Sequence, residues 1–372
     1  MGSDGVMGGV FHSPPVTLHS VTSFAVWLDF PHTVESPPMI ILAADVGGTK
    51  SNLGLFEKSA AAHGSGTAAA LRFEKSYPTQ KLGTLASVLV DFLKEAGSRA
   101  QDVSAACIGI AGPVEDGQCV AEWLPWHHVD EKEVGAGAGI ENTRLINDMV
   151  ATAWGVTAVR PEQLVTLNRG EPKLNRNIAV IAAGTGLGES ALIFDDGKYH
   201  ALTSEGGHTD WAPRTKTDLD LFRFLLERTD RVNNEHVLRG RGICNVHAFF
   251  KGLETGQFPR ELPDTDAQAG EIARQGLAEP TSAAGKAMDL FVSAYGARAG
   301  NLAMQVMSTG GVYVGGGIAP KNLELMKSGK FMEAFVDKGP LFRPILQKMP
   351  VHVVTEQKTG LLGAAQYAFA HA

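Results

Sequence analysis

Three glycine-rich turns are the first residues whose type and spacing suit a chemical task. They are Asp45-Val46-Gly47-Gly48-Thr49-Lys50, Gly184-Thr185-Gly186-Leu187-Gly188 and Val314-Gly315-Gly316-Gly317. Glycines without a Cβ let backbone N–H groups approach phosphate oxygens. Each turn alone is also typical of an ordinary tight turn, and neither a P-loop nor a dinucleotide-binding glycine motif follows the first apolar run. Since each of the three ends an apolar run, together they predict a nucleotide site.

Two aspartates, each at the end of an apolar run, have roles that the sequence leaves open. Asp45, at the end of an apolar run, suits a magnesium ion held through water, because magnesium gives up its waters reluctantly. Asp148, in Asn147-Asp148, suits a general base that takes the proton of a hydroxyl attacking phosphorus. The alternatives are a solvated turn aspartate and an ordinary helix N-cap, and for Asn147-Asp148 alone the cap is favoured.

Acids and imidazoles further along the chain suit the recognition of a polyol. Ser204-Glu205-Gly206-Gly207-His208 places Glu205 and His208 on one short loop, where a carboxylate and an imidazole bind neighbouring hydroxyls. A surface turn with a solvated pair is the alternative. Glu235 stands near the start of an expected helix, where an acid is also favoured by the helix dipole.

Apolar runs and helical periodicity predict the elements that carry these residues. We expect buried strands over residues 39–44, 52–56, 105–111, 144–146, 178–183, 190–194, 312–314 and 351–355. We expect helices over 85–93, from about 217, over 281–307 as one helix or two, and over 360–370. This alternation predicts an α/β protein. A strand–glycine turn–strand pattern occurs at 45–56 and again at 184–194, which would clamp a nucleotide between two domains.

Length and composition limit the class of protein. A chain of 372 residues is long enough for about two domains. Its net charge of −7 argues against a dedicated nucleic-acid binder. Three widely spaced cysteines give no disulfide framework or paired metal ligands, and no apolar run is long enough to span a membrane. We expect a cytoplasmic protein, with residues 1–38 as an extension and residues 60–70 as a loop.

Together these segments resemble the bacterial-type glucokinase family within the actin-like superfamily of sugar kinases. The run Glu205–His208, followed by Asp210 and Ala212-Pro213, is the most specific piece. The other matching segments are 45–49, 109–114, 145–148, 183–188, 235–238 and 314–317, and they come in the family's order. The resemblance covers the chain from about residue 39 to its end.

The resemblance implies a two-domain actin-like (ribonuclease H-like) fold with an interdomain cleft, and the phosphorylation of glucose by ATP with Mg²⁺. The small domain would span 39–159 plus 356–372, and the large domain 160–355. Asp148 would be the catalytic base. Asn147, Glu205, His208 and Glu235 would hold glucose. Asp45 would orient Mg²⁺ through water, with no direct protein ligand. The resemblance also implies that the nucleotide is bound by Gly47, Gly48, Thr49, Gly184, Thr185, Gly186, Gly315, Gly316 and Gly317, and that a homodimer forms.

Other interpretations stay open at this point. A kinase for another hexose or an N-acetylhexosamine would share the fold, and so would a non-catalytic sugar sensor or an actin-like ATPase. The related ROK proteins carry a cysteine-rich zinc motif beside the sugar-binding histidine. Here no cysteine follows His208 until Cys244, which argues against that zinc.

Overall fold

The computed structural model of the chain describes residues 38–58 and 69–372. The extension expected over residues 1–38 and the loop expected over residues 60–70 lie almost wholly outside these ranges. None of the described helices is long and apolar enough to cross a membrane.

The first sheet has five strands in the order β3-β2-β1-β4-β8. Its strands are β1 (Ile40–Val46), β2 (Lys50–Lys58), β3 (Ala69–Pro78), β4 (Ala105–Ile110) and β8 (Thr143–Asn147). β1 pairs antiparallel with β2 and parallel with β4, so the turn Gly47–Thr49 and residue Asn147 emerge at the same edge of the sheet. A separate small sheet consists of β5 (Val114–Glu115), β6 (Gln118–Val120) and β7 (His128–Asp130).

The second large sheet repeats this plan with six strands in the order β12-β11-β10-β13-β14-β9. Its strands are β9 (Leu164–Asn168), β10 (Ile178–Ala183), β11 (Leu187–Asp195), β12 (Lys198–Leu202), β13 (Gly311–Gly315) and β14 (Val351–Val354). β10 pairs antiparallel with β11 and parallel with β13, as β1 pairs with β2 and β4. The repeat predicted from the two strand–glycine turn–strand segments is therefore confirmed.

The helices begin where local capping groups stand. Thr84, Asp130, Asn147, Thr215 and Ser282 each accept a backbone N–H at the start of a helix. The helices are α1 (Leu85–Glu95), α2 (Glu131–Ala138), α3 (Asp148–Gly155), α4 (Lys216–Leu226), α5 (Gly240–Thr255), α6 (Ala269–Ala278), α7 (Ala283–Val306), α8 (Leu323–Met326), α9 (Lys330–Val336), α10 (Gly339–Gln347) and α11 (Thr359–His371). Short 3₁₀ helices span Thr79–Lys81, Ala100–Asp102, Pro161–Gln163, Gly206–His208, Asn234–His236 and Pro320–Asn322. The segment expected over 281–307 is one helix.

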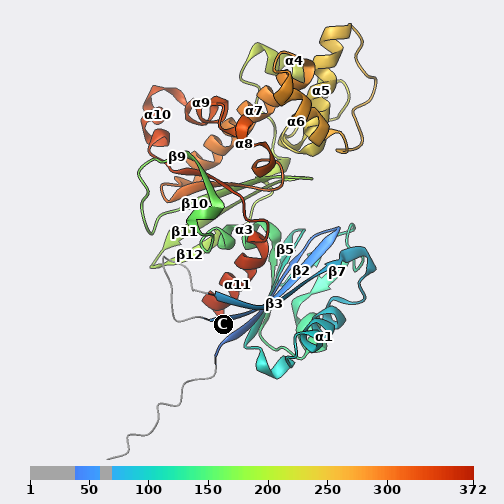
Figure 1. The fold of residues 1–372 in the computed structure, drawn as a ribbon, viewed down its shortest axis with the longest axis vertical. Helices are drawn as coiled ribbons and strands as arrows, with labels where there is room; N and C mark the ends of the chain where they lie inside the picture. Colours follow the sequence, from blue (N-terminus) through green and yellow to red (C-terminus); the bar gives the residue numbers. More distant parts are fainter. Residues whose placement is uncertain (1–37, 59–68) are drawn as a thin grey trace, which may run out of the picture. The chain divides into compact units, whose positions relative to one another are not determined.

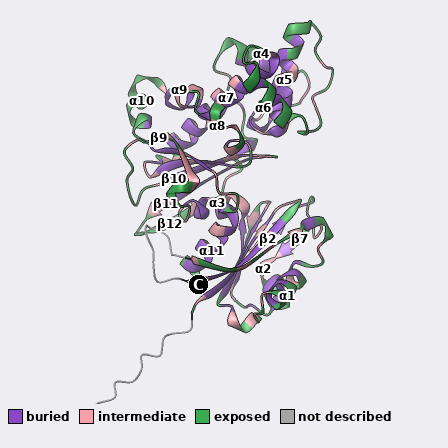
Figure 2. Cartoon of the chain, in the orientation of Figure 1, coloured by how far each residue is buried: buried purple, intermediate pink, exposed green. Residues whose placement is uncertain are grey.

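Each face of the two large sheets is covered by helices (Figure 1). One apolar cluster joins the first sheet to α1 and α2, and another joins the second sheet to α5, α6, α7 and α9. A third cluster contains α3 and α11 with residues of both sheets, such as Ile41 and Val180. The buried residues therefore run through both sheets and through the helices between them (Figure 2).

The contact between α3 and α11 brings two helix backbones very close together. A Cβ on Gly363 would lie 1.6 Å from the Ala151 carbonyl oxygen, and a Cβ on Gly155 would lie 2.0 Å from the Thr359 carbonyl oxygen. Only glycine fits at either position. Because α3 and α11 both begin near the end of β1, this packing sets where their first residues lie relative to Asp45.

Tyr295, on α7, ties that helix to the end of β10. Its fully buried hydroxyl accepts the Ala183 N–H at 3.0 Å and donates toward the Ile181 carbonyl at 3.3 Å. The Ala183 N–H is buried away from water, and this hydrogen bond to the tyrosine hydroxyl fixes the backbone immediately before Gly184.

We expect Tyr295→Phe to lower the free energy of unfolding by about 1–3 kcal/mol, because it leaves the buried Ala183 N–H without a partner. Chemical denaturation monitored by circular dichroism measures this. Tyr313→Phe, in the neighbouring strand β13 where the hydroxyl makes no hydrogen bond within the described residues, is the matched control and should change stability much less. Equal effects of the two substitutions would contradict the role given to the Tyr295 hydroxyl.

Candidate active site

One pocket of about 600 Å³ gathers residues from both sheets and from the helices between them. Its wall holds the carboxylates of Asp45, Asp148 and Glu356, and the glycine turn Gly315–Gly317. The lining residues extend from Asp45 to Gly360, which are 315 positions apart in the sequence. The pocket therefore unites the ends of β1, β13 and β14 with the first turns of α3 and α11.

Asn147 and Asp148 divide the two roles that the sequence left open for them. Asn147 is buried and is the N-cap of α3, since its Oδ1 accepts the Met149 N–H at 2.9 Å and the Val150 N–H at 3.3 Å. Its Nδ2 donates to the Gly112 carbonyl at 2.9 Å, which leaves one hydrogen for a ligand. Asp148 is the first helical residue, and its Oδ1 accepts the Met149 N–H at 2.8 Å, while its other oxygen accepts no hydrogen bond from another residue in the described ranges.

The carboxyl group of Asp148 is poised to hold or release a proton near neutral pH. Burial raises its pKa most, and the negative charge of Asp45 adds to this effect. The Met149 N–H acts in the opposite direction, and Glu205 raises the pKa a little further. The result is a pKa of about 6. A carboxylate with such a pKa suits general base catalysis better than one with an ordinary value.

Asp45 lies beside the N-terminus of α11. A Cβ on Gly360 would lie 3.1 Å from the Asp45 carboxyl carbon, so glycine at that position allows the helix to begin there. Burial raises the pKa of Asp45, while a hydrogen bond from the Asn52 side chain, its partner across β1 and β2, lowers it. Since the charge of Asp45 also raises the pKa of Asp148, a nearby cation would favour the ionised forms of both carboxyl groups.

The turn Gly47–Thr49 is held from outside the hairpin. The Thr79 hydroxyl donates to the Gly47 carbonyl at 2.7 Å, and the Thr79 N–H donates to the Thr49 carbonyl at 3.0 Å. The Gln80 amide donates to the Gly48 carbonyl at 2.9 Å. With these carbonyls engaged, the shape of the turn does not depend on a ligand.

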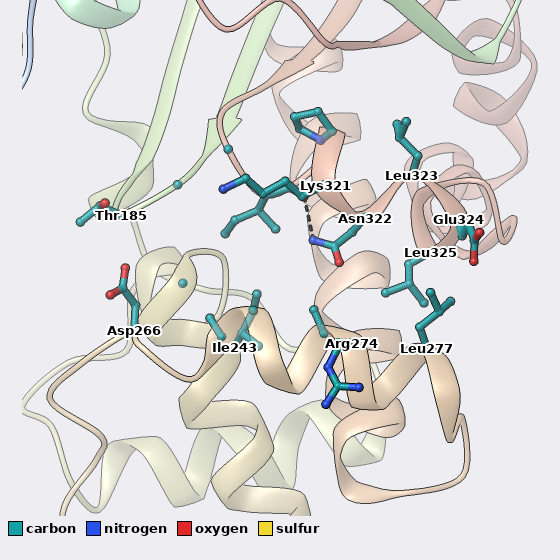
Figure 3. Close-up of a pocket in the computed structure, with 18 residues that line it drawn as sticks. Thr185, Ile243, Asp266, Arg274, Leu277, Lys321, Asn322, Leu323, Glu324 and Leu325 are labelled. Carbon is teal, nitrogen blue, oxygen red and sulfur yellow. Dashed lines mark hydrogen bonds between the residues drawn. The ribbon is translucent and has the colours of Figure 1, made fainter. Parts of the chain in front are cut away.

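A second pocket of about 860 Å³ lies between α5, α6 and the loop after β13 (Figure 3). Its wall includes Gly184 and Thr185 on one side and apolar residues such as Ile243, Ala273 and Leu277 on the other. Gly317, Pro320 and Lys321 line both pockets. The two pockets are therefore neighbours along one loop, and the second suits a flat, weakly polar group.

Gly316, between the two pockets, cannot be replaced by a residue with a side chain. Its φ is +77°, and a Cβ there would lie 2.3 Å from the Ala183 carbonyl oxygen. The turn after β13 thus packs directly on the end of β10, which brings the turns predicted at 184–186 and 315–317 together.

The loop that carries Glu205 and His208 is exposed at these two side chains but firmly anchored beneath them. Glu189, which is 1% exposed, forms a bidentate ion pair with Arg298 at 2.5 and 2.6 Å. Arg298 also donates to the Gly206 carbonyl at 3.3 Å. A Cβ on Gly206 would lie 2.0 Å from a Glu189 oxygen, so the loop sits directly on this pair.

Glu235 has a structural connection to the second glycine turn. One carboxylate oxygen accepts the Leu187 N–H at 2.9 Å, and the other accepts the Arg239 guanidinium at 2.8 Å. Glu235 lies in the 3₁₀ helix Asn234–His236 rather than at the start of α5, which begins at Gly240. The neighbouring Asn234 amide donates to the Thr209 carbonyl at 2.9 Å, so the loop of Glu205 and the turn of Glu235 are joined.

The predicted residues fall into two groups. Asp45, Asp148 and Gly315–Gly317 line the pocket of about 600 Å³, and Gly184 and Thr185 line its neighbour. Asn147, Glu205, His208 and Glu235 line neither pocket, and the charge of Glu205 makes a small contribution to the raised pKa of Asp148.

Sequence reasoning missed the residues that support the site. These are Thr79, Glu189, Asn234 and Arg298, whose side chains bind site backbone or each other. Single charged or polar residues far apart in the chain carry no local signal. Glu189, just before the apolar run at 190–194, could have given a hint, because a strand interior seldom holds an unpaired charge.

Comparisons with known proteins give one consistent result. The family described as Glucokinase matches residues 42–371. A curated glucokinase from Nostoc sp. is 35% identical over 344 residues, covering 88% of this chain and 98% of that protein. One from Colwellia psychrerythraea is 31% identical, covering 90% and 97%. The crystal structure of a glucokinase from an Antarctic psychrotroph superposes with a TM-score of 0.76 at 26% identity, covering 90% of this chain and 100% of that one.

The raised pKa of Asp148 predicts that its charge opposes folding at neutral pH. The folded protein holds this proton up to a pKa of about 6, whereas the unfolded chain releases it near 3.8. The folded state therefore loses stability as the pH rises through this interval. We expect Asp148→Asn to raise the melting temperature at pH 7, with the gain fading towards pH 4.

Asp102→Asn is the matched control for this measurement. The hydrogen bond from the Arg99 side chain lowers the pKa of Asp102, so its ionised form favours the folded state. Its substitution should lower the melting temperature at pH 7. A melting temperature of Asp148→Asn equal to or below that of the wild type at pH 7 would show that the Asp148 charge is well tolerated.

Proposed function

The chain belongs to the glucokinase family, and we propose that it transfers the γ-phosphate of ATP to the 6-hydroxyl of glucose with Asp148 as the base. The predicted enzyme class, a glucokinase that uses ATP, and the predicted actin-like sugar kinase fold are confirmed by the family match and by the curated relatives. The main support for Asp148 as the base is its position in a pocket lined by a glycine turn, together with its pKa of about 6.

We assign the two neighbouring pockets to the two parts of the nucleotide. The adenosine occupies the pocket of about 860 Å³, whose apolar wall suits a flat ring. The phosphates pass Gly184–Gly186 and Gly315–Gly317 and end between Asp148 and the turn Gly47–Thr49. The support for this order is the shared wall at Gly317, Pro320 and Lys321, because a single ligand can run from one pocket to the other along it.

The sugar contacts come from the two joined loops and from α3. We assign to glucose the free Nδ2 hydrogen of Asn147, the exposed side chains of Glu205 and His208, and Glu235. The Glu235 carboxylate already accepts hydrogen bonds from the Leu187 N–H and from Arg239. We therefore assign it two tasks, which are to hold the second glycine turn and to bind a sugar hydroxyl. The ion pair of Glu189 and Arg298 positions this set from below.

The proposed reaction is a direct transfer. The 6-hydroxyl oxygen of glucose forms a bond to the γ-phosphorus as the bond from that phosphorus to the β-bridging oxygen breaks, and ADP leaves. The hydroxyl proton passes to the free Asp148 oxygen. Phosphoryl transfer depends mostly on positioning and on stabilisation of charge, so the base orients the hydroxyl as much as it removes the proton.

The residues present fit a magnesium ion. Asp45 and Asp148 line one pocket, and the charge of Asp45 raises the pKa of Asp148, an effect that a cation would reverse. We propose that Asp45 holds Mg²⁺ through water. The ion would supply neutralisation of the phosphate charge. An ion held through water needs few direct protein ligands, because Mg²⁺ gives up its waters reluctantly.

Several expectations remain predictions. They are the division into a small domain (39–159 and 356–372) and a large domain (160–355), the cleft between them, the homodimer and the cytoplasmic location.

Preference for glucose over another hexose or an N-acetylhexosamine is tested by ADP release across glucose, fructose, mannose, N-acetylglucosamine and N-acetylmannosamine, with a no-sugar control. Turnover that does not depend on sugar would contradict the kinase assignment.

We expect Asp148→Ala to lower kcat by about 10²-fold or more while glucose binding stays detectable, because the base orients the attacking hydroxyl. In the wild type, kcat/KM should rise with pH through about 6 and then level off, since only the ionised carboxylate accepts a proton. Steady-state kinetics between pH 5 and 8 measure both. Asp91→Ala, on the exposed face of α1, is the control. Near-normal turnover of Asp148→Ala would remove Asp148 from the base role.

We expect Glu205→Gln to weaken glucose binding more than ATP binding, because Glu205 is exposed at the sugar side and lines neither nucleotide pocket. Apparent KM values for both substrates measure the difference. Losses of equal size for glucose and ATP would indicate a folding defect, and unchanged values would exclude Glu205 from the sugar site.

A further inference from the structure

The loop after β13 connects the two neighbouring pockets through three residues. Gly317, Pro320 and Lys321 line both the pocket of about 860 Å³ and the pocket of about 600 Å³ that holds Asp148. Of these three, only Lys321 carries a charge. In Figure 3 its side chain extends towards the side of the pocket where Thr185 lies.

The backbone that carries Lys321 is fixed, but its side chain is free. The Ile318 N–H donates to the Ala183 carbonyl at 3.2 Å, and the Asn322 side-chain amide donates to the Ile318 carbonyl at 2.8 Å. The Lys321 side chain is exposed and makes no hydrogen bond or ion pair within the residues that the structure describes. The protein thus presents an ammonium group from a rigid loop without using it to hold the fold.

Lys321 stands in a pocket whose other charged side chains, among the described residues, are acidic. Among the residues that the structure describes, the wall of the 600 Å³ pocket contains three carboxylates, from Asp45, Asp148 and Glu356, and one positive side chain, that of Lys321. The phosphates of a nucleotide would add further negative charge to this wall. The negative charge of Asp45 already contributes to the raised pKa of Asp148.

Other cations near the proposed nucleotide path are less suitable. Arg274 lines the larger pocket, but its guanidinium is paired with Glu271 at 2.5 Å. Lys50, next to the first glycine turn, lines neither pocket. In the described part of the chain, Lys321 is therefore the unpaired cation that lines both pockets.

We propose that Lys321 binds the phosphate chain of the nucleotide between the adenosine and the transferred phosphate. This inference rests on the nucleotide placement proposed above. A lysine at the junction of the pockets contacts phosphates that are present in ATP, in ADP and in the transition state alike. Such uniform binding changes the affinity for nucleotide and leaves kcat nearly unchanged.

The experiment compares Lys321→Met with wild type, using the full chain. Isothermal titration calorimetry with ADP and with AMP, in the presence of Mg²⁺ and without sugar, measures affinity independently of activity. We expect the Kd for ADP to rise about 10–100-fold, the range for loss of a charge-assisted hydrogen bond. The Kd for AMP should rise much less. In steady-state assays KM for ATP should rise similarly, while kcat and KM for glucose stay within about twofold.

Two further variants separate this role from a general effect of charge or fold. Lys327→Met removes an exposed lysine from the end of α8, in the same segment but on the wall of neither pocket, and should leave the Kd for ADP unchanged. Lys321→Arg keeps the charge and should restore most of the affinity.

Three results would overturn the inference. They are an unchanged Kd for ADP in Lys321→Met, an equal loss of affinity for AMP and ADP, and a fall in kcat without a change in the Kd for ADP. If the wild type phosphorylates glucose while one of these is observed, only the role of Lys321 is wrong. A wild type that binds ADP but phosphorylates no sugar would instead contradict the proposed function.

Discussion

The site depends on the close packing of α3 against α11 between the two large sheets. Gly155 and Gly363 remove the side chains that would keep these helices apart. Since α3 follows β8 directly and α11 begins beside Asp45, the packing places Asp148 and Asp45 on the wall of one pocket. A larger residue at either glycine would separate the helices, and with them the carboxylates.

Bringing these carboxylates together is unfavourable for folding and useful for catalysis. Burial and mutual repulsion raise the pKa of Asp148 to about 6, so that a proton is held and released near physiological pH. Some other buried polar groups near the site have hydrogen-bond partners. The buried Glu189–Arg298 pair and the Tyr295 hydroxyl hold the surrounding loops in place without a ligand.

Local sequence patterns predicted the central strands and the amphipathic helix α1 well, and the strands at the sheet edges poorly. The apolar run at 178–183 coincides with β10, and the periodicity at 85–93 lies within α1. The strand β3 was not predicted, because it lies at a sheet edge, where six of its ten residues are exposed and none is buried. Asn147-Asp148 was ambiguous because a cap and a base use the same residue types. The structure assigns the cap to Asn147 and leaves Asp148 free on one oxygen.

The sequence by itself determined the glycine turns, the strands that end in them and the acids that follow, because these depend on residues adjacent in the chain. Only the tertiary structure decided which of them meet. Glu189 and Arg298 are 109 positions apart, and the wall that Lys321 shares between two pockets depends on Gly316 packing against the end of β10. Such contacts follow from the way whole sheets and helices pack, and no single stretch of sequence encodes them.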